Sequence, residues 1–559
     1  MFTPKRASLT LAAVTGLLVV GGLAADAALS PTPEGFTTER SADLAAQIDP
    51  SKPRNVILII GDGMDDSMIT AARNYEYGAG GRFPALDALP FTGAMTTYGL
   101  KAGAGPDYPK AYVSDSAPTA SGWSTGKKTI DGRVSQGPSA AGNIPGENYE
   151  TVLEKYQAEG KLVGNVTTSE ITDATPAAAA AHMSQRGCQG PTDMTACATE
   201  KKSAGGLGSI AEQLVDHKID VLLGGGKNRY VQATDAGPSV LDYATTTKGY
   251  RLVENKAALD GVTSLAGGPV LGLFSGGNMT PRYNPLVATP PPGAGGPTAR
   301  CTDADRANQP DLSAMTAKAI DLLDNPDGFF LQAESAMIDK QEHASDICGA
   351  IGDLRELDEA VQVALDYQVA NPDTLVIVTG DHSHSTQIVG GVTDGKQTAT
   401  LLTADGDPMT VAYSTSDVGS DHTGAQIRVA ASGPQAANVT GVIDQTDLFR
   451  TLLGRTPSVL PGGQPAVVKP AVSVAADGPI SRSELQRRGV QVAVAATGAT
   501  TVKVSLSKGD KTLTTRTLSA RGGTTTLQAK TGPGVVKVVA TAVGAGGTTK
   551  ATKSVRVTR

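Results

Sequence analysis

The chain has 559 residues, which is too long for one ordinary domain and long enough to bury a sizeable core. Its net charge of −7 is unevenly divided. From Ala471 to the end, fourteen Lys and Arg residues stand against three acidic ones, a net charge of +11, so the preceding residues carry −18. This asymmetry indicates a separate C-terminal module. The module has no Phe, Tyr or Trp on which bases could stack, so nucleic-acid binding is not expected.

The N-terminus has the pattern of a secretory signal peptide over residues 1–27. Lys5 and Arg6 precede an apolar stretch from Leu9 to Leu23, and Ala25-Asp26-Ala27 offers a small-residue cleavage site. A membrane anchor is the alternative, but the apolar stretch is shorter than the roughly 20 residues that a spanning helix needs. We therefore expect a secreted, extracytoplasmic protein of the periplasm or cell surface, where disulfides are permitted.

The chain contains four cysteines, which allow three sets of two disulfides. The pairing of neighbours, Cys188 with Cys197 and Cys301 with Cys348, is the most economical. A four-cysteine metal site is the competing interpretation, but the chain has no Cys-x-x-Cys pair.

Residues 28–52 are expected to form an irregular arm, and residues 53–455 alternate between apolar strands and helices. The predicted strands are residues 56–60, 162–166, 221–223, 329–332 and 375–379. The predicted helices are residues 67–75, 314–323 with Ser313 as the N-cap, and 354–367. Continuous apolar strands separated by helices favour an α/β fold, with a mainly parallel sheet sandwiched by helices.

Residues 456–470 are rich in Pro and Gly and indicate a linker. Residues 471–559 then change pattern, with short alternating runs that begin at Val490, Val502 and Val535. This pattern predicts a small antiparallel β-sandwich.

Four of the six histidines lie among carboxylates in three short strings. The strings are Asp339-Lys340-Gln341-Glu342-His343, Asp381-His382-Ser383-His384 and Asp421-His422. Imidazole nitrogens and carboxylate oxygens are ligands that zinc accepts. Asp339 and His343 are four residues apart, which places them on one face of a helix. A surface Asp–His pair would explain one string alone, but three strings in one domain favour a metal site.

Three carboxylates follow predicted strands within a residue or two: Asp62, Glu334 and Asp381. Ligands of such sheets bind beyond the carboxyl ends of the strands, so these side chains are expected at one edge. Ser116, after Asp115, opens a predicted helix, where unpaired N–H groups favour a phosphoryl group. Ser116 is therefore a candidate nucleophile, and the alternative is a simple N-cap.

These motifs resemble the bacterial alkaline phosphatases over residues 53–455. The resemblance rests on Ile60-Gly61-Asp62-Gly63-Met64, Asp115-Ser116-Ala117 followed by Trp123-Ser124-Thr125-Gly126, Asp173-Ala174-Thr175-Pro176, and the histidine strings. It implies a secreted enzyme that hydrolyses phosphate monoesters through a phosphoserine, with two Zn²⁺ and one Mg²⁺. It also implies a homodimer and two disulfides. The module after residue 470 lies outside the resemblance.

The resemblance assigns metal ligands residue by residue. It implies that the first zinc is held by Asp339, His343 and His422, and the second by Asp62, Asp381 and His382. Asp62 would also reach toward magnesium, which Asp173, Thr175 and Glu334 would complete as an oxygen-only set.

The remaining roles concern phosphate and the support of the ligands. Arg186 would clamp phosphate as a bidentate fork, oriented by Asp115, and Lys340 would reach it through water. His384 would orient a ligating carboxylate without binding metal itself. Glu342 departs from the pattern, because near relatives carry an aspartate there.

Three other functions are alternatives to this one. A phosphodiesterase of the same superfamily is the nearest. A sulfatase needs Arg at the fourth position after its nucleophile, where this chain has Ala120. An exported binding protein with structural metals would not need Ser116 or Arg186. For the basic module, the alternatives are a solvated spacer and adhesion to an anionic cell-surface polymer.

Overall fold

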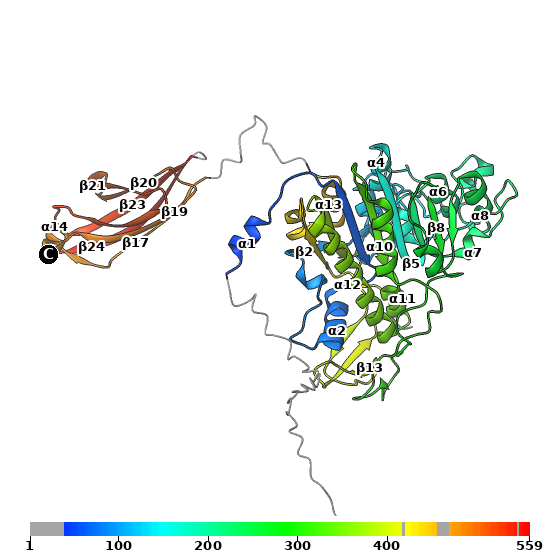
Figure 1. Ribbon diagram of the computed structural model, residues 1–559. Helices are drawn as coiled ribbons and strands as arrows, with labels where there is room; N and C mark the ends of the chain where they lie inside the picture. The colour runs from blue at the N-terminus through cyan, green and yellow to red at the C-terminus, as the bar shows by residue number, and fades with distance from the viewer. Residues whose placement is uncertain (1–38, 416–419, 456–468, 545–546) are drawn as a thin grey trace, which may run out of the picture. The chain divides into compact units, whose positions relative to one another are not determined.

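The computed structural model describes residues 39–415, 420–455, 469–544 and 547–559. The expected signal peptide and residues 456–468 of the expected linker lie outside these ranges. The chain divides into two compact units, residues 1–456 and residues 457–559 (Figure 1). In the arm that the sequence predicts to be irregular, helix α1 forms over Ser41–Ala46, so that prediction is wrong for these residues.

A ten-stranded sheet forms the centre of the first unit (Figure 1). From one edge to the other its strands are β16 (Gly441–Asp444), β2 (Phe91–Thr96), β15 (Ile427–Ser432), β11 (Thr374–Gly380), β1 (Asn55–Gly61), β10 (Phe329–Ser335), β5 (Leu162–Glu170), β6 (Val221–Gly225), β8 (Val270–Leu273) and β7 (Arg251–Val253). All neighbours pair in parallel except the two pairs that β15 makes.

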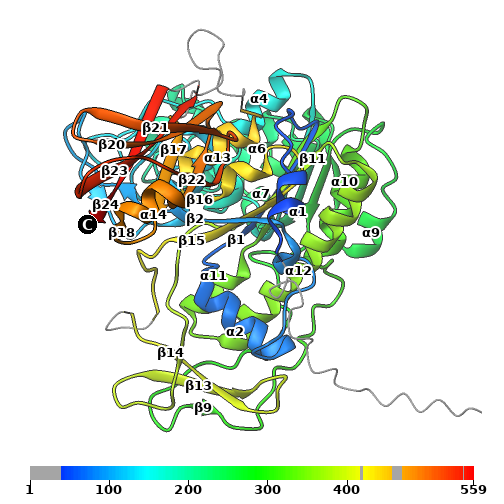
Figure 2. The ribbon, with the colours of Figure 1, turned by 90° about the vertical axis from the view of Figure 1, so that its left-hand side faces the viewer.

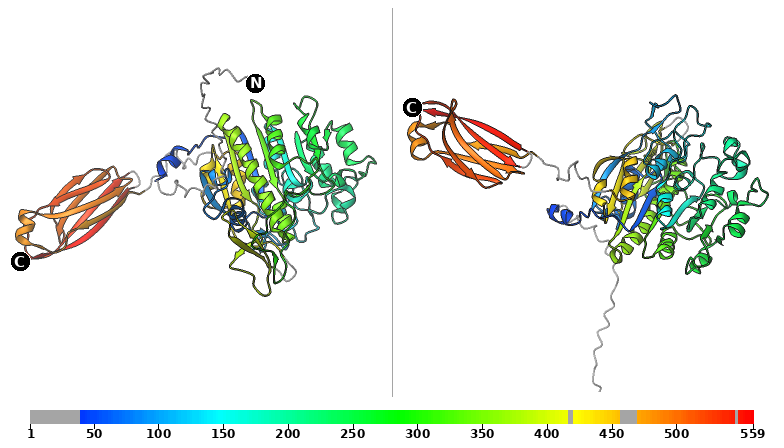
Figure 3. Two further views of the ribbon diagram at one scale, coloured as in Figure 1. Left: turned by 60° about the horizontal axis from the view of Figure 1, so that its bottom comes forward. Right: turned by 90° about the horizontal axis from the view of Figure 1, so that it is seen from above.

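Both faces of this sheet are buried, as the continuous apolar strands predict. Along β1, Ile57 and Ile59 belong to one hydrophobic cluster, and Val56, Leu58 and Ile60 belong to the other. The first cluster includes residues of α2 (Asp66–Tyr77), α10 (Leu312–Leu323), α11 (Met337–His343) and α12 (Ile347–Ala370). The second includes residues of α3 (Ser116–Thr125), α4 (Val152–Ala158), α5 (Ala174–Ala178), α6 (Ile210–Asp216) and α13 (Gln445–Leu452). Figure 3 shows helices on both sides of the strands, so the predicted α/β sandwich is confirmed.

Two helices begin at least two residues earlier than the sequence predicts. The N-cap of α10 is Asp311, not Ser313, because Asp311 has extended backbone and the helix begins directly after it. Helix α12 begins seven residues before Leu354. Gly349 and Gly352 disfavour a helix in isolation, but a Cβ at Gly352 would lie 2.9 Å from the Tyr283 ring. The glycine therefore lets another segment pack closely against this helix.

A smaller sheet extends the first unit beyond the main one (Figure 2). Its strands are β12 (Gln387–Val389), β14 (Pro408–Tyr413), β13 (Gln397–Leu402) and β9 (Ala294–Gly295). The remaining short elements are β3 (Gly99–Leu100), β4 (Lys110–Ala111), α7 (Lys227–Tyr230), α8 (Val240–Asp242) and α9 (Lys256–Asp260). Two disulfides, Cys188–Cys197 and Cys301–Cys348, show the pairing expected from the sequence.

The second unit consists of two sheets that enclose an apolar core of mainly Val side chains. One sheet has the order β17 (Ala471–Ala476), β19 (Val490–Thr497) and β22 (Gly522–Leu527). The other has the order β18 (Ile480–Ser481), β24 (Gly547–Thr558), β23 (Gly534–Gly544), β20 (Thr501–Lys508) and β21 (Lys511–Leu518). The predicted β-sandwich is confirmed. Two details were not predicted, the short helix α14 (Arg482–Arg487) and the parallel pairing of β18 with β24.

Among the residues that the structure describes, no helix combines the length and the apolar character that crossing a membrane requires.

Candidate active site

The carboxyl ends of three neighbouring strands bring the predicted carboxylates together. Strand β1 lies between β10 and β11, with Ile60 paired to Glu334 and Gly61 paired to Gly380. Asp62 and Asp381 each follow directly on their strands, and Glu334 occupies the end of its own. All three side chains are almost completely buried. Parallel strands thus place three carboxylates from distant parts of the chain at one edge.

Asp62, Asp381 and His382 form one group whose ligand atoms lie close enough to share a metal ion. His382 Nε2 is 3.3 Å from both Asp62 Oδ1 and Asp381 Oδ2. Its other ring nitrogen, Nδ1, is 3.3 Å from the Ser383 carbonyl oxygen, which can only accept. The proton of a neutral ring therefore belongs on Nδ1. The lone pair of Nε2 is left free on the side of the carboxylates, where a metal ion could bind it.

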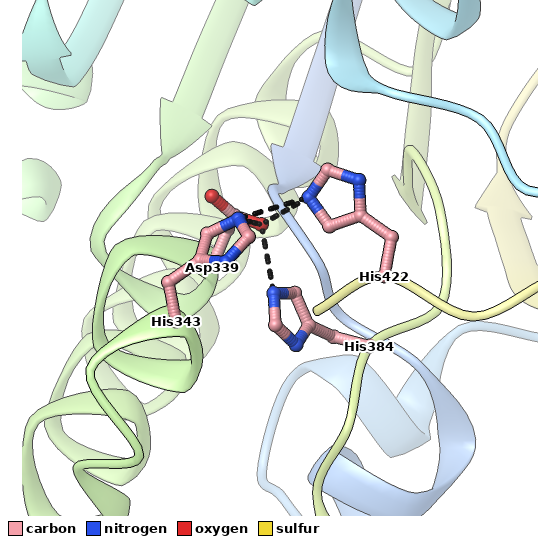
Figure 4. A group of neighbouring side chains, drawn as sticks. All are labelled: Asp339, His343, His384 and His422. Atoms are coloured by element: carbon pink, nitrogen blue, oxygen red, sulfur yellow. Dashed lines mark hydrogen bonds and ion pairs between the residues drawn. The ribbon is translucent and has the colours of Figure 1, made fainter. Parts of the chain in front are cut away.

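Asp339, His343, His384 and His422 form a second group with the same property (Figure 4). Asp339 and His343 both lie on α11, as their spacing predicts, with 3.5 Å between Asp339 Oδ1 and His343 Nε2. His422 Nε2 lies 3.2 Å from that same oxygen and 3.0 Å from His343 Nε2. Asp421, although part of the same string, is exposed, and its side chain accepts the His422 backbone N–H.

His384 differs from His343 in its tautomer. Its Nδ1 accepts the backbone N–H of Ser385 at 2.8 Å, so the proton of the neutral ring must lie on Nε2. Burial lowers the pKa of His384 to about 2, although the charge of Asp339 opposes this shift. The ring therefore stays neutral. Nε2 faces Asp339 Oδ1 at 3.4 Å. Distances alone would admit His384 as a ligand, but a protonated Nε2 does not offer a lone pair to a metal ion.

Ser116 is the first residue of α3, and Asp115 is the N-cap that precedes it. The interpretation of Ser116 as an N-cap is therefore wrong. Its Oγ lies 3.1 Å from Asp62 Oδ1 and 3.2 Å from His382 Nε2, both in the Asp62–Asp381–His382 group. The hydroxyl is buried at the positive end of α3, which favours negative charge.

Arg186 and Lys340 supply the positive charge of the site. The Arg186 guanidinium donates from Nη1 to Asp115 Oδ1 and from Nη2 to Asp173 Oδ1. Lys340 Nζ lies 3.1 Å from Asp173 Oδ2 and 3.7 Å from Asp62 Oδ2. Burial would raise the pKa of Asp173, but these two cations outweigh it and the net shift is downward.

Glu334, Asp173 and Thr175 are the oxygen donors near the Asp62 carboxylate. Glu334 Oε2 accepts the Thr167 hydroxyl at 2.5 Å, which fixes its orientation. Thr175 Oγ1 is buried, and the described part of the chain offers it no hydrogen-bond partner. An unpaired buried hydroxyl beside carboxylates is what a hard divalent cation would satisfy.

Buried carboxylates that lie close together hold their protons unless positive charge is added. Burial and the charge of Asp62 both raise the pKa of Glu334 and of Asp381 well above the usual range. Together with the free imidazole nitrogens and the Thr175 hydroxyl, this donor set fits divalent cations.

Fold and site together define the class: an α/β protein whose sheet edge gathers side chains that could bind metal ions beside a buried serine. The family model described as alkaline phosphatase matches residues 53–417. Alkaline phosphatase H of Pseudomonas aeruginosa is 46% identical over 73% of this chain and 86% of its own length. Alkaline phosphatase of Escherichia coli is 45% identical over 75% of this chain and 89% of its own length. Streptomycin-6-phosphate phosphatase of Streptomyces griseus is 42% identical over 74% of this chain and 91% of its own length.

Solved structures show the same fold. The alkaline phosphatase of Thermus thermophilus covers 75% of this chain and 94% of its own, with a TM-score of 0.54 at 20% identity. The match to the alkaline phosphatase of the Antarctic bacterium TAB5 covers 73% of this chain and 98% of the TAB5 chain, with a TM-score of 0.53 at 22% identity. The chain belongs to the alkaline phosphatase family and is a phosphomonoesterase of that family, which confirms the resemblance seen in the sequence.

Several supporting residues escaped the sequence analysis. Gly63 N–H donates to Asp381 Oδ1 at 2.9 Å, and Ser383 Oγ donates to Asp65 Oδ2 at 2.6 Å. Glu342 Oε1 accepts the Thr386 hydroxyl in the buried surroundings of Gly63. These contacts depend on segments far apart in sequence, so no local pattern could indicate them.

Proposed function

We propose that this alkaline phosphatase hydrolyses phosphate monoesters through a phosphoserine at Ser116, at a centre of two zinc ions and one magnesium ion. One observation carries the proposal. The Ser116 hydroxyl lies within hydrogen-bond distance of Asp62 and His382, two members of a metal-capable group, at a helix N-terminus. A serine that serves only as a cap would not face two metal-ligand side chains.

The donor sets assign each ion. Asp339, His343 and His422 would hold one zinc, and Asp62, Asp381 and His382 the other, since mixed nitrogen and oxygen ligands suit zinc. Asp62, Asp173, Thr175 and Glu334 offer only oxygen and suit magnesium. When bound, such ions would stabilise negative charge on the attacking and leaving oxygens of an in-line displacement.

The residues of the chain perform the remaining tasks. Arg186 presents a planar fork to two phosphate oxygens, and Asp115 fixes the plane of that fork. Lys340 adds positive charge near the same oxygens. The Ser116 oxygen forms a bond to phosphorus as the bond from phosphorus to the ester oxygen breaks, and the alcohol leaves. Water then attacks the phosphoserine, which releases inorganic phosphate and restores the hydroxyl.

The location and assembly of the protein are further parts of the proposal. Two disulfides support folding in an oxidising, extracytoplasmic compartment, in keeping with the signal-like N-terminal sequence. A homodimer remains a prediction of the family resemblance. Binding of the basic C-terminal unit to an anionic cell-surface polymer also remains a prediction.

The central experiment traps the phosphoserine. Ser116→Ala should abolish labelled phosphoenzyme and lower kcat by orders of magnitude while metal content stays the same. Ser124→Ala is the matched control, because Ser124 is also buried on α3 but outside the site. Labelled phosphate retained by Ser116→Ala protein would contradict the role of Ser116.

Metal removal tests the other half of the proposal. Chelation should abolish activity, and adding Zn²⁺ with Mg²⁺ should restore more of it than either ion alone. Elemental analysis of the restored enzyme counts the ions directly. Rates on a monoester and a diester of the same alcohol separate this function from the phosphodiesterase alternative, and a faster diester reaction would favour the latter.

A further inference from the structure

The two histidines that lie outside the sequence strings, His182 and His217, converge on Glu154. His182 Nε2 lies 3.1 Å from Glu154 Oε1, and His217 Nε2 lies 3.6 Å from the same oxygen. The three ligand atoms all lie within 4.8 Å of one another. In the described ranges of the chain, every histidine therefore belongs to a group that could hold a metal ion, and this group is separate from the active site.

The orientation of His182 is that of a metal ligand. Its Nδ1 is 3.0 Å from the carbonyl oxygen of Ser135, which can only accept a hydrogen bond. The Nδ1 proton is therefore fixed there, and a neutral ring directs a free Nε2 toward Glu154. His343 and His382 in the active site are oriented in the same way, by the carbonyls of Ser420 and Ser383.

Glu154 is also held in place by one oxygen while the other stays available. It is the third residue of α4, and its Oε2 accepts the backbone N–H of Thr151 at 2.7 Å in a capping box. This bond leaves Oε1 to face both histidines. A carboxylate fixed by a hydrogen bond through its second oxygen is a well-oriented monodentate ligand.

The separations suit a transition-metal ion. Zinc bonds to nitrogen and oxygen ligands are about 2.0–2.2 Å long, so ligand atoms around one tetrahedral ion lie about 3.4 Å apart. The two distances to Glu154 Oε1, 3.1 and 3.6 Å, bracket this value. Access is also present, because the side chains of Glu154 and His217 keep 19% and 25% of their surface exposed.

A buried ion pair without metal is the competing explanation, and it leaves one ring unexplained. Burial lowers the pKa of His182, but the hydrogen bond and charge of Glu154 outweigh burial, so the net shift is upward. A protonated His182 would therefore form an ion pair with Glu154. His217 gains little from that arrangement, since burial lowers its pKa and a distance of 3.6 Å is too long for a hydrogen bond. The nearby charges of Asp216 and Lys248 oppose each other. A shared cation would bind all three side chains at once.

We propose that Glu154, His182 and His217 form a further divalent transition-metal site, of the zinc type, outside the active site. Three protein ligands leave one position for water. The ion would join α4, the segment after α5 and the C-terminal end of α6. Arg186 lies four residues after His182 in that joined segment. An ion that binds only the folded state raises its stability in proportion to the logarithm of ion concentration.

The test measures metal content and thermal stability in the full-length protein. Wild type and variants are dialysed to equilibrium against buffered Zn²⁺, and zinc per chain is determined by elemental analysis. His217→Ala and Glu154→Gln should each lose one zinc per chain relative to wild type, with hydrolytic activity unchanged. Glu154→Gln retains an oxygen for the capping box, so its loss of zinc would not reflect a broken helix. Asp216→Asn is the matched control, because it changes the neighbouring charge and removes no ligand.

Thermal unfolding gives an independent measure. After the active site is saturated, further Zn²⁺ should raise the Tm of wild type and Asp216→Asn but not that of His217→Ala or Glu154→Gln. Equal zinc content in all four proteins, or an equal Tm response, would overturn the site and leave an ion-pair network. The Ser116→Ala experiment tests the active site, so its result is independent of the test of the Glu154–His182–His217 site.

Discussion

At the scale of single residues, the fixed tautomers of the histidines decide what each ring can do. His343 and His382 give their Nδ1 protons to backbone carbonyls and turn Nε2 toward carboxylates. His384 accepts a backbone N–H at Nδ1 and turns a protonated Nε2 toward Asp339. The first two therefore have an Nε2 lone pair free for a metal ion, whereas His384 does not. This distinction depends on neighbouring backbone groups and not on residue type.

Arg186 carries the first prediction. Its guanidinium bridges Asp115 and Asp173, so its fork is oriented before substrate arrives. Arg186→Ala should raise KM for phosphate esters and weaken inhibition by inorganic phosphate, since both bind through two parallel hydrogen bonds. Arg186→Lys should recover little, because lysine keeps the charge but lacks the fork.

Steady-state kinetics with phosphate as inhibitor measure these effects. The matched control is Arg229→Ala, which removes an arginine that also contacts two carboxylates, Glu170 and Asp193. Arg229 has no proposed contact with phosphate, so the inhibition constant should stay the same. Equal phosphate inhibition in wild type and Arg186→Ala would remove Arg186 from the phosphate site.

The residues of the candidate site could be predicted to an unusual degree, because their motifs are local strings. The Asp339–His343 spacing placed both on α11, and the strand ends placed Asp62 and Asp381 together. The Glu154 group could not be found in this way. Its members lie on three separate segments with no shared string, and the only signal was that two histidines remained unassigned.

At the scale of elements, helix α12 connects the core to the site. Asp358 on this helix is buried, and its Oδ1 accepts the backbone N–H groups of Ala85 and Leu86 at 3.1 and 2.7 Å. Burial raises the pKa of Asp358 to about 6, although these hydrogen bonds oppose the shift. A raised pKa in the folded state means that the folded protein retains this proton to higher pH than the unfolded chain.

The second prediction follows from the sign of this shift. Between about pH 4 and pH 6 the unfolded chain binds fewer protons at Asp358, so its contribution to the free energy of unfolding falls as pH rises. A shift of about two pKa units corresponds to about 2–3 kcal/mol. Asp358→Asn keeps an accepting oxygen and removes the charge. The variant should therefore gain about 2–3 kcal/mol relative to wild type between pH 4 and pH 7.

Denaturant unfolding at several pH values measures this difference. Asp366→Asn is the control, because it removes a carboxylate from the exposed face of the same helix. A constant difference for Asp358→Asn would mean that the carboxylate stays charged in the folded protein throughout this range.

The disulfides give the third prediction, also at the scale of elements. Cys301–Cys348 joins positions 47 residues apart and ties the segment before α10 to α12, whereas Cys188–Cys197 joins positions nine apart. The chain-entropy model assigns about 4 kcal/mol to the longer loop and about 2.6 kcal/mol to the shorter. Removing the longer bridge by paired Cys→Ala substitution should therefore lower the midpoint of unfolding more than removing the shorter. Peptide mapping checks the pairing, and the reverse order of stability would contradict the entropic account.

Element boundaries were the weakest part of the sequence analysis, and the reason is tertiary packing. The glycines in the first turns of α12 argue against a helix, yet Gly352 makes room for the Tyr283 ring. The periodic and apolar features, which depend on burial of whole faces, were predictive for both the parallel sheet and the C-terminal sandwich.

At the scale of the whole molecule, the chain consists of two units with separate cores and opposite charge. All proposed ligands, Ser116 and Arg186 belong to the first unit. In the second unit, four basic residues share the solvent face of the five-stranded sheet. They are Lys503, Lys537, Lys550 and Arg556, and all four are exposed. A basic face without aromatic side chains suits attraction to an anionic polymer through charge.

The last prediction separates the two units. Deletion of residues 471–559 should leave kcat and metal content nearly unchanged, because no proposed site residue lies there. Full-length protein should bind an anionic polymer more tightly than the truncated protein, and this binding should weaken steeply as salt rises. Replacing the four basic residues of the sheet face by Gln should reproduce the loss of binding while the unit stays folded. Co-sedimentation measures this binding. Equal binding of all three proteins would exclude adhesion through the second unit, and the two units would still be separable. Loss of activity in a folded, fully metallated truncation would instead show that the second unit shapes the active site.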